Sequence, residues 1–186
     1  MKLIQILVND INAVNKCLTL DALKCQHAET FSGIGKMKEK YEIQMKKDSV
    51  PVIHPPRKVP ASLKTELKEE LCKMVDQHII APVTEATDWV NSLVLVKKNS
   101  KKLRICLDPK DLNKYIKRPN YPMPTVEETT QNLHGAKVFS TFDAKHGFWQ
   151  VELTEKSSLL TTFNTPFGRY RWLRMPFGIC SASEEF

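Results

Sequence analysis

A single acidic residue, Asp143, stands where an apolar run ends in the stretch FSTFDAKHGFWQVEL, residues 139–153. A glycine and two large aromatic residues follow it at Gly147, Phe148 and Trp149. A buried carboxylate is costly unless it is paired or binds a cation, and a carboxylate at a strand end suits a Mg²⁺ site. The plainer interpretation is a solvated turn or capping residue, with Phe148 and Trp149 as core residues. This stretch alone therefore leaves both interpretations open.

Basic residues are concentrated between residues 97 and 118, where nine Lys or Arg stand against two Asp. This block carries a net charge of +7, so the rest of the chain sums to zero. Lys97 and Arg104 flank a predicted turn, and a flexible ammonium and a rigid guanidinium could grip one triphosphate from two sides. The block favours a polyanionic partner, and a solvated lysine-rich hairpin is the alternative.

Composition excludes several classes of protein. The 186 residues correspond to one domain or slightly more, and 41% hydrophobic with 26% charged residues is typical of a soluble globular protein. Five irregularly spaced cysteines without a C-x-x-C pair argue against a disulfide framework or a zinc site. The longest early apolar run, LIQILV, is too short for a signal-peptide core or a membrane span. We therefore expect an intracellular protein with no membrane contact.

Strands and helices are predicted in alternation but without regular βαβ spacing, which indicates an α+β architecture. Alternating patterns predict strands at 39–45, 90–98 and 103–108, a strand leading to Asp143, and a hairpin at 160–175. Helical patterns predict helices at 61–77 and 124–135 and a further helix that begins near residue 181. Residues 1–30 have weak helical periodicity, and the four prolines of residues 50–60 favour an extended connector.

Three blocks in order resemble one protein family: WVNSLVLVKKNSKKLRICLDPKDLNKYIKRPNYPMPTVEE, FSTFDAKHGFWQVEL and TTFNTPFGRYRWLRMPFGICSASEEF. They resemble the reverse transcriptase of gypsy-type long-terminal-repeat retrotransposons, and more distantly that of retroviruses, from about Phe31 to Phe186. The resemblance implies a right-hand polymerase fold at 61–186. Its fingers would comprise about 61–117 and 151–175, and its partial palm about 118–150 and 176–186. Residues 1–30 would be a polyprotein connector, and 31–60 an extended lead-in.

The resemblance also assigns roles to the residues that match the family's motifs. Asp143 corresponds to the first catalytic aspartate, a ligand of both Mg²⁺ ions of the complete enzyme, and Ala144 would lend its backbone carbonyl to one ion. Lys97 and Arg104 correspond to fingers residues that bind the incoming triphosphate. Phe148 corresponds to the aromatic steric gate that excludes a ribose 2′-hydroxyl.

The resemblance also places further residues of the same motifs. Phe177 and Gly178 correspond to the segment beside the nucleotide and template. Asp108 and Asn113 fit the family pattern, and we interpret both as structural. The basic hairpin would contact nucleic acid through Lys98, Lys101 and Lys102.

The sequence departs from the family where His146 and Phe148 replace the common Ser and Tyr, and where Ser183 replaces Pro. No Asp-Asp pair occurs in the 186 residues, so the family's Tyr-x-Asp-Asp motif is expected downstream of residue 186. The thumb, connection and RNase H regions of the Pol polyprotein are expected there as well.

We therefore predict a fragment of an RNA-directed DNA polymerase from a retroelement. The complete enzyme would use deoxynucleoside triphosphates and two Mg²⁺ ions to extend a primer on an RNA or DNA template, in the cytoplasm and also the nucleus. The fragment alone is predicted to be inactive. The alternative is a non-enzymatic remnant that at most binds nucleic acid through its basic hairpin.

Overall fold

The computed structural model describes residues 20–97, 103–122, 124–135, 137, 144 and 146–185. It separates into two compact units, residues 1–35 and 36–186. The described part of the first unit contains two short helices, α2 (Leu20–Gln26) and α3 (Ala28–Phe31), as its weak helical periodicity predicted. Within the described residues, no helix has the length and apolar character needed to cross a bilayer.

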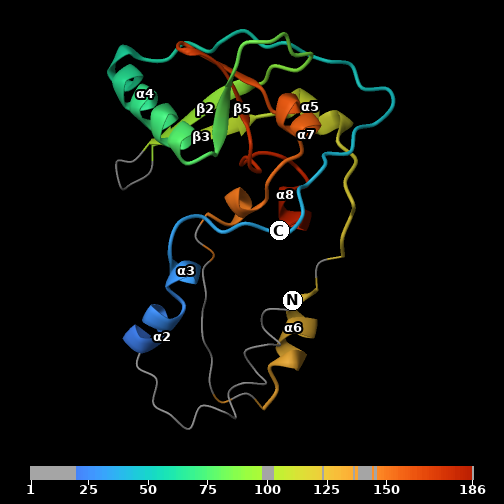
Figure 1. Ribbon diagram of the computed structural model, residues 1–186. Helices are drawn as coiled ribbons and strands as arrows, with labels where there is room; N and C mark the ends of the chain where they lie inside the picture. The colour runs from blue at the N-terminus through green and yellow to red at the C-terminus, as the bar shows by residue number, and fades with distance from the viewer. Residues whose placement is uncertain are drawn as a thin grey trace. The chain divides into compact units, whose positions relative to one another are not determined.

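The second unit is organised around two small antiparallel sheets (Figure 1). In the three-stranded sheet, β5 (Gly168–Trp172) lies between β1 (Ile80–Val83) and β4 (Phe163–Thr165). The other sheet is a two-stranded ribbon of β2 (Ser92–Lys97) and β3 (Leu103–Asp108). The predicted strands at 90–98 and 103–108 and the predicted hairpin at 160–175 are thereby confirmed.

Helix α4 (Ala61–Asp76) packs against the sheets and confirms the prediction of a helix at 61–77. Leu67, Leu71 and Met74 are its buried residues, which is the one-sided stripe that a 3.6-residue period produces. This helix contacts β1 of one sheet and β3 of the other, so it packs against both sheets (Figure 1). The fully buried Trp172 and Phe163 add the largest side chains of the core, with ring centroids 5.9 Å apart.

The remaining helices are short. They are α5 (Lys110–Tyr115), α6 (Val126–Asn132), the 3₁₀ turn η2 (Gly147–Gln150), α7 (Glu155–Leu160) and α8 (Ala182–Glu185). The predicted capping box is present at α6, where Thr125 and Glu128 each accept the backbone N–H of the other. Helix α8 begins where a helix was predicted. Strands and helices are thus interspersed without regular βαβ units, as in an α+β protein, and this prediction is confirmed.

One predicted strand is wrong. Residues 39–45 form isolated bridges instead, because Tyr41 pairs with Leu153 and Met45 pairs with Ile116. The segment pairs with a different part of the chain at each bridge, so it does not form a continuous strand of one sheet. The strand predicted before Asp143 lies outside the described residues.

Candidate functional site

The β2–β3 ribbon presents Lys97 and Arg104 on opposite faces. Lys97 is opposite Leu103 in the ladder, whereas Arg104 is opposite Val96, and paired residues share a face of a ribbon. Both side chains are exposed, while the alternate residues of β3, such as Ile105, are buried. The structure therefore does not bring the two predicted triphosphate cations together on one surface.

Each cation has its own partner. The Lys97 ammonium lies 3.9 Å from the Glu66 carboxylate on α4, and both side chains are partly exposed. The Arg104 guanidinium lies over the Phe177 ring, 5.1 Å from its centroid. Cation–π contacts of this kind hold a guanidinium plane without neutralising it. Among the residues that the structure describes, no carboxylate pairs with Arg104, so its charge can serve an anionic ligand. Lys98, Lys101 and Lys102 lie outside the described residues.

Phe177 is held in place by a turn that requires glycine at the next position. Gly178 has φ of +112°, and a Cβ built there would lie 2.5 Å from the Leu107 carbonyl oxygen. The Asn113 side chain binds both ends of the turn: it donates to the Gly178 carbonyl at 2.8 Å and accepts the Cys180 N–H at 3.0 Å. The structural interpretation of Asn113 agrees with these contacts. The turn is thus fixed against β3 and α5.

Phe148 reaches the same place from η2. Its ring centroid is 5.2 Å from that of Phe177, in a tilted arrangement. Trp149 approaches Phe177 edge-on at 6.4 Å and stacks on His146 at 4.6 Å. We call Arg104, Phe148, Trp149 and Phe177 the aromatic corner. Both Phe rings are only partly buried, so neither belongs to the fully packed core.

The predicted metal ligands are barely described. Asp143 lies outside the described residues, and Ala144 is an exposed residue without regular secondary structure. Among the residues that the structure describes, no group of three His, Cys, Asp or Glu side chains could hold a metal ion. The Asp143 and Ala144 assignments therefore remain predictions.

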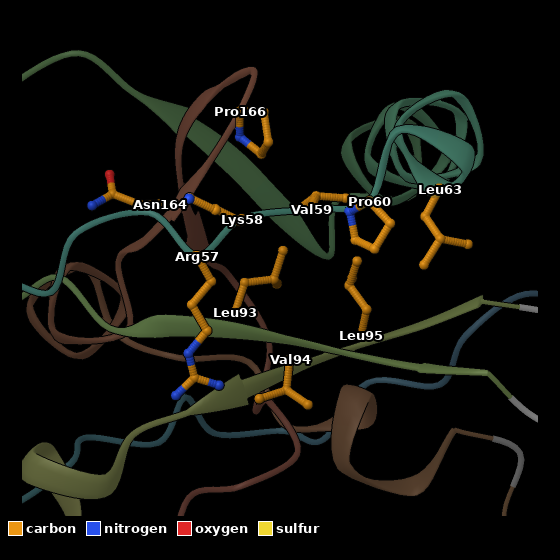
Figure 2. Close-up of a pocket in the computed structure, with 10 residues that line it drawn as sticks. All are labelled: Arg57, Lys58, Val59, Pro60, Leu63, Leu93, Val94, Leu95, Asn164 and Pro166. Carbon is orange, nitrogen blue, oxygen red and sulfur yellow. The ribbon is translucent and has the colours of Figure 1, made fainter.

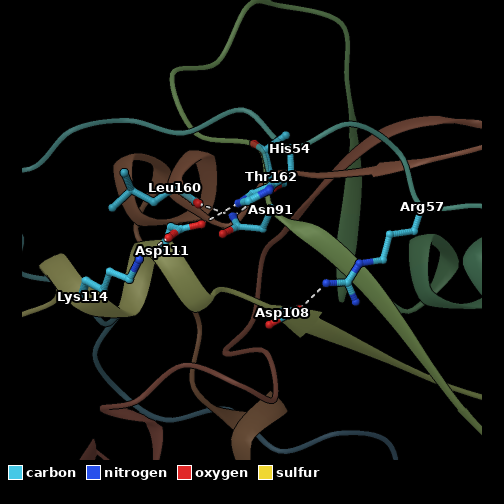
Figure 3. A network of polar contacts seen from close by, with 8 residues as sticks. All are labelled: His54, Arg57, Asn91, Asp108, Asp111, Lys114, Leu160 and Thr162. Carbon is cyan, nitrogen blue, oxygen red and sulfur yellow. Dashed lines mark hydrogen bonds and ion pairs between the residues drawn. The ribbon is translucent and has the colours of Figure 1, made fainter.

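A second set of contacts attaches the proline-rich segment to the other end of the ribbon (Figure 3). Arg57 pairs with Asp108 at the end of β3, and the His54 ring lies 2.8 Å from the Asp111 carboxylate on α5. Lys114 also binds Asp111, and its hydrogen bond is the largest cause of the lowered pKa of that carboxyl group. We call residues 52–57 with these partners the polar strap.

Backbone contacts complete the polar strap. The His54 N–H donates to the Val90 carbonyl, and the Val90 N–H donates to the Val52 carbonyl. The Asn164 side chain donates to the His54 carbonyl at 2.7 Å. Asp108, which the sequence analysis interpreted as structural, forms its ion pair with Arg57 of this strap.

A cavity of about 290 Å³ lies between the polar strap, α4 and β2 (Figure 2). Its apolar lining comes mainly from Val59, Pro60, Leu63, Leu93, Leu95 and Pro166. Arg57 and Lys58 add two cations, but the lining contains none of the predicted nucleotide-binding residues. The cavity and the aromatic corner are therefore separate features of the ribbon.

Sequence reasoning missed two charged residues behind the aromatic corner. Arg174 donates to the Trp149 carbonyl at 2.7 Å, and its guanidinium lies 3.6 Å from the Glu152 carboxylate. The available signal was a charged residue inside the otherwise apolar run WLRMPFG, where burial would demand a partner.

Comparisons with known proteins show which family these elements resemble. Residues 96–183 match the family described as "Reverse transcriptase (RNA-dependent DNA polymerase)". The chain is 36% identical over 169 residues to the uncharacterized protein K02A2.6 of Caenorhabditis elegans, covering 88% of this chain and 13% of that protein. It is 33% identical over 153 residues to the retrovirus-related Pol polyprotein from transposon 412 of Drosophila melanogaster, covering 78% of this chain and 12% of the polyprotein.

Solved structures show the same fold. The protease-reverse transcriptase of prototype foamy virus superimposes with a TM-score of 0.75 at 20% identity, over 88% of this chain and 22% of the viral one. The foamy viral enzyme in complex with an RNA/DNA hybrid gives a TM-score of 0.62 at 16% identity, over 80% of this chain and 20% of that one. The predicted polymerase fold is thereby confirmed. The chain spans about an eighth of the length of the nematode protein and of the transposon 412 polyprotein.

Proposed function

We propose that this chain is part of a retroelement RNA-directed DNA polymerase of the gypsy type, because residues 96–183 match the reverse transcriptase family. The observation that supports this proposal most directly is the aromatic corner. Arg104, Phe148 and Phe177 come from β3, η2 and the 176–180 turn, and their side chains meet with no carboxylate of the described residues paired to the arginine. A cation beside partly exposed rings suits a ligand with both phosphate and a sugar or base.

In the proposed complex, Arg104 binds the triphosphate of an incoming deoxynucleotide through its planar guanidinium. Lys97 joins it after leaving Glu66. An exposed ion pair contributes only about 0.2–1 kcal/mol, so exchanging that carboxylate for a triphosphate costs little. Lys97 is the last residue of β2, where a long side chain can turn around the end of the ribbon. Phe148 forms the side of the pocket that would exclude a 2′-hydroxyl.

We further propose that Asp143 and the Ala144 carbonyl hold Mg²⁺, with more carboxylates supplied by a Tyr-x-Asp-Asp segment of the longer polyprotein. The ions would neutralise charge on the transferring phosphoryl group. Lys98, Lys101 and Lys102 would contact the backbone of an RNA or DNA template-primer, in the cytoplasm and nucleus of the host cell. On this proposal residues 1–186 are inactive by themselves, because one carboxylate and one carbonyl cannot offset the repulsion of two divalent ions.

Primer extension tests the proposal. The 186-residue chain should give no product, whereas a chain continued through the second acidic segment and thumb should extend a primed template. Asp143→Asn in the continued chain should abolish extension, while Asp108→Asn, which removes a structural carboxylate, should leave it largely intact. Failure of the continued chain to extend any primer would favour the non-enzymatic remnant, and full activity of Asp143→Asn would refute the metal-ligand assignment.

A further inference from the structure

The turn that carries Phe148 begins in an unfavourable backbone conformation. His146, the residue before η2, has φ of +54°, in the left-handed region that non-glycine residues rarely adopt. Such a conformation persists only where the surrounding structure over-determines it. Contacts from outside the turn must therefore hold it in place.

Arg174 supplies such a contact. Its side chain is only 12% exposed, and it donates a hydrogen bond of 2.7 Å to the carbonyl of Trp149, the residue next to Phe148. The backbone nearby is tied as well, because Glu152 forms an isolated bridge with Arg174 and the Met175 N–H donates to the Val151 carbonyl. Arg174 stands three residues before Phe177. One arginine thus links the η2 turn to the segment that carries the facing ring.

Glu152 and Lys36 hold Arg174 in turn. The Glu152 carboxylate lies 3.6 Å from the Arg174 guanidinium and 2.9 Å from the Lys36 ammonium. The lead-in segment also binds the end of η2 through its backbone, since the Met37 N–H donates to the Gln150 carbonyl at 2.8 Å. A guanidinium that is only 12% exposed and has a carboxylate partner and a carbonyl acceptor has little freedom to move.

We propose that Arg174, oriented by Glu152, is a positioning residue that sets the place of Phe148 against Phe177 and thereby the discrimination between deoxyribose and ribose. Arg174 does not touch the nucleotide; it acts through the Trp149 carbonyl. The inference rests on the proposed function, because it presupposes that Phe148 is the sugar gate. A gate works through steric contact, so a shift of about 1 Å in its backbone is enough to change a rate by up to about 100-fold.

The test measures the ratio of kcat/KM for a deoxynucleotide to kcat/KM for the matching ribonucleotide, in the chain continued through the second acidic segment. Loss of folded protein lowers both values equally and cancels in the ratio, so a merely structural role would leave it unchanged. Phe148→Val serves as the reference and should lower the ratio by roughly 10- to 200-fold, the range for a change of shape in an apolar pocket. The expected decrease for Arg174→Gln is about 3- to 10-fold, below the limit of about 100-fold for a contact displaced by 1 Å.

Three further variants make the result decisive. Arg174→Lys keeps the positive charge and should restore part of the ratio. Glu152→Gln should lower the ratio in the same direction as Arg174→Gln, and both variants supply the measurement if Arg174→Gln does not fold. Arg171→Gln is the matched control, because Arg171 is also an arginine of the same segment paired with a carboxylate, that of Glu155, and it should leave the ratio unchanged.

The outcomes separate the two proposals. If Phe148→Val lowers the ratio but the Arg174 and Glu152 variants do not, the positioning role is wrong and the gate assignment stands. If Phe148→Val leaves the ratio unchanged, the gate assignment fails, and the positioning role fails with it. A decrease in Arg171→Gln equal to that in Arg174→Gln would also overturn the inference, because the effect would then not depend on the Trp149 carbonyl.

Discussion

The aromatic corner and the polar strap both attach to β3, and they are built from different interactions. In the aromatic corner, Arg104 near the start of the strand lies over the Phe177 ring, and the glycine turn after Phe177 packs against Leu107. The polar strap contacts Asp108 at its end with ion pairs and hydrogen bonds. Asp108 and Asp111, the two acids of the basic block, both face the strap.

This difference gives separate roles to the acids and to the cations of the basic block, residues 97–118. The upstream side chains of Arg57 and His54 use the acids of the block for attachment of the lead-in segment. The cations near the turn have weaker partners: an exposed carboxylate for Lys97 and an uncharged ring for Arg104. Positive charge is therefore left available at the end of the ribbon where the proposed triphosphate binds.

The largest expected effect comes from Gly178, in the turn that holds Phe177 of the aromatic corner. Gly178→Ala places a Cβ 2.5 Å from a backbone carbonyl and imposes a positive φ on alanine, so we expect a loss of about 3 kcal/mol in the free energy of unfolding. Gly168→Ala is the control, since its φ is also positive but no atom lies within 4 Å of the new Cβ; it should cost about 1 kcal/mol. Urea unfolding measures both values, and equal losses would show that the close approach to Leu107 has no energetic weight.

A smaller difference is expected between two asparagines that hold backbone groups. Asn113→Ala removes two hydrogen bonds from the 176–180 turn and should cost about 2 kcal/mol. Asn164→Ala removes one hydrogen bond from the polar strap and should cost about 1 kcal/mol. Nucleotide binding should weaken only in Asn113→Ala, because Phe177 belongs to the turn that Asn113 holds. Weakening of the same size in Asn164→Ala would mean that the two regions are not independent supports.

Local sequence patterns were enough to predict the elements that carry these regions. The alternation of β2 and β3, the apolar stripe of α4 and the capping box at Thr125 each depend on residues within one turn or one ladder spacing. Strand β1 was missed because it contains Pro82, which sequence rules discount within strands. Pro82 is tolerated because β1 is an edge strand of its sheet. Helix α7 was missed because its buried Ser157 and Ser158 hide the apolar period.

The contacts that define the site could not be read from local patterns. Asn113 binds Gly178 and Cys180 across 65 and 67 residues, and no spacing rule connects such positions. Phe148 and Phe177 were identified by family resemblance, since an aromatic residue after a strand is as easily a core residue. Arg174 was overlooked because a pattern shows that a charge is present but not which carbonyl accepts its hydrogen bond.

The smallest expected effect is the response of the two regions to acid. Lys114, followed by His54, lowers the pKa of Asp111 below its ordinary value. A group whose pKa is lower in the folded state stabilises the fold above its unfolded pKa of about 3.9, and this contribution disappears as the pH falls through the folded value. Asp111→Asn should therefore lower stability at pH 6, and its difference from the unmodified chain should shrink as the pH falls below about 4. In the aromatic corner, Phe177 packs on Phe148 and Trp149, whose rings carry no titratable group, so the loss caused by Phe177→Leu should be independent of pH over the same range. Thermal unfolding of the three chains between about pH 2.5 and 6 measures both trends. A pH-independent difference for Asp111→Asn, or a loss for Phe177→Leu that disappears in acid, would contradict the division into an ionic and an aromatic support.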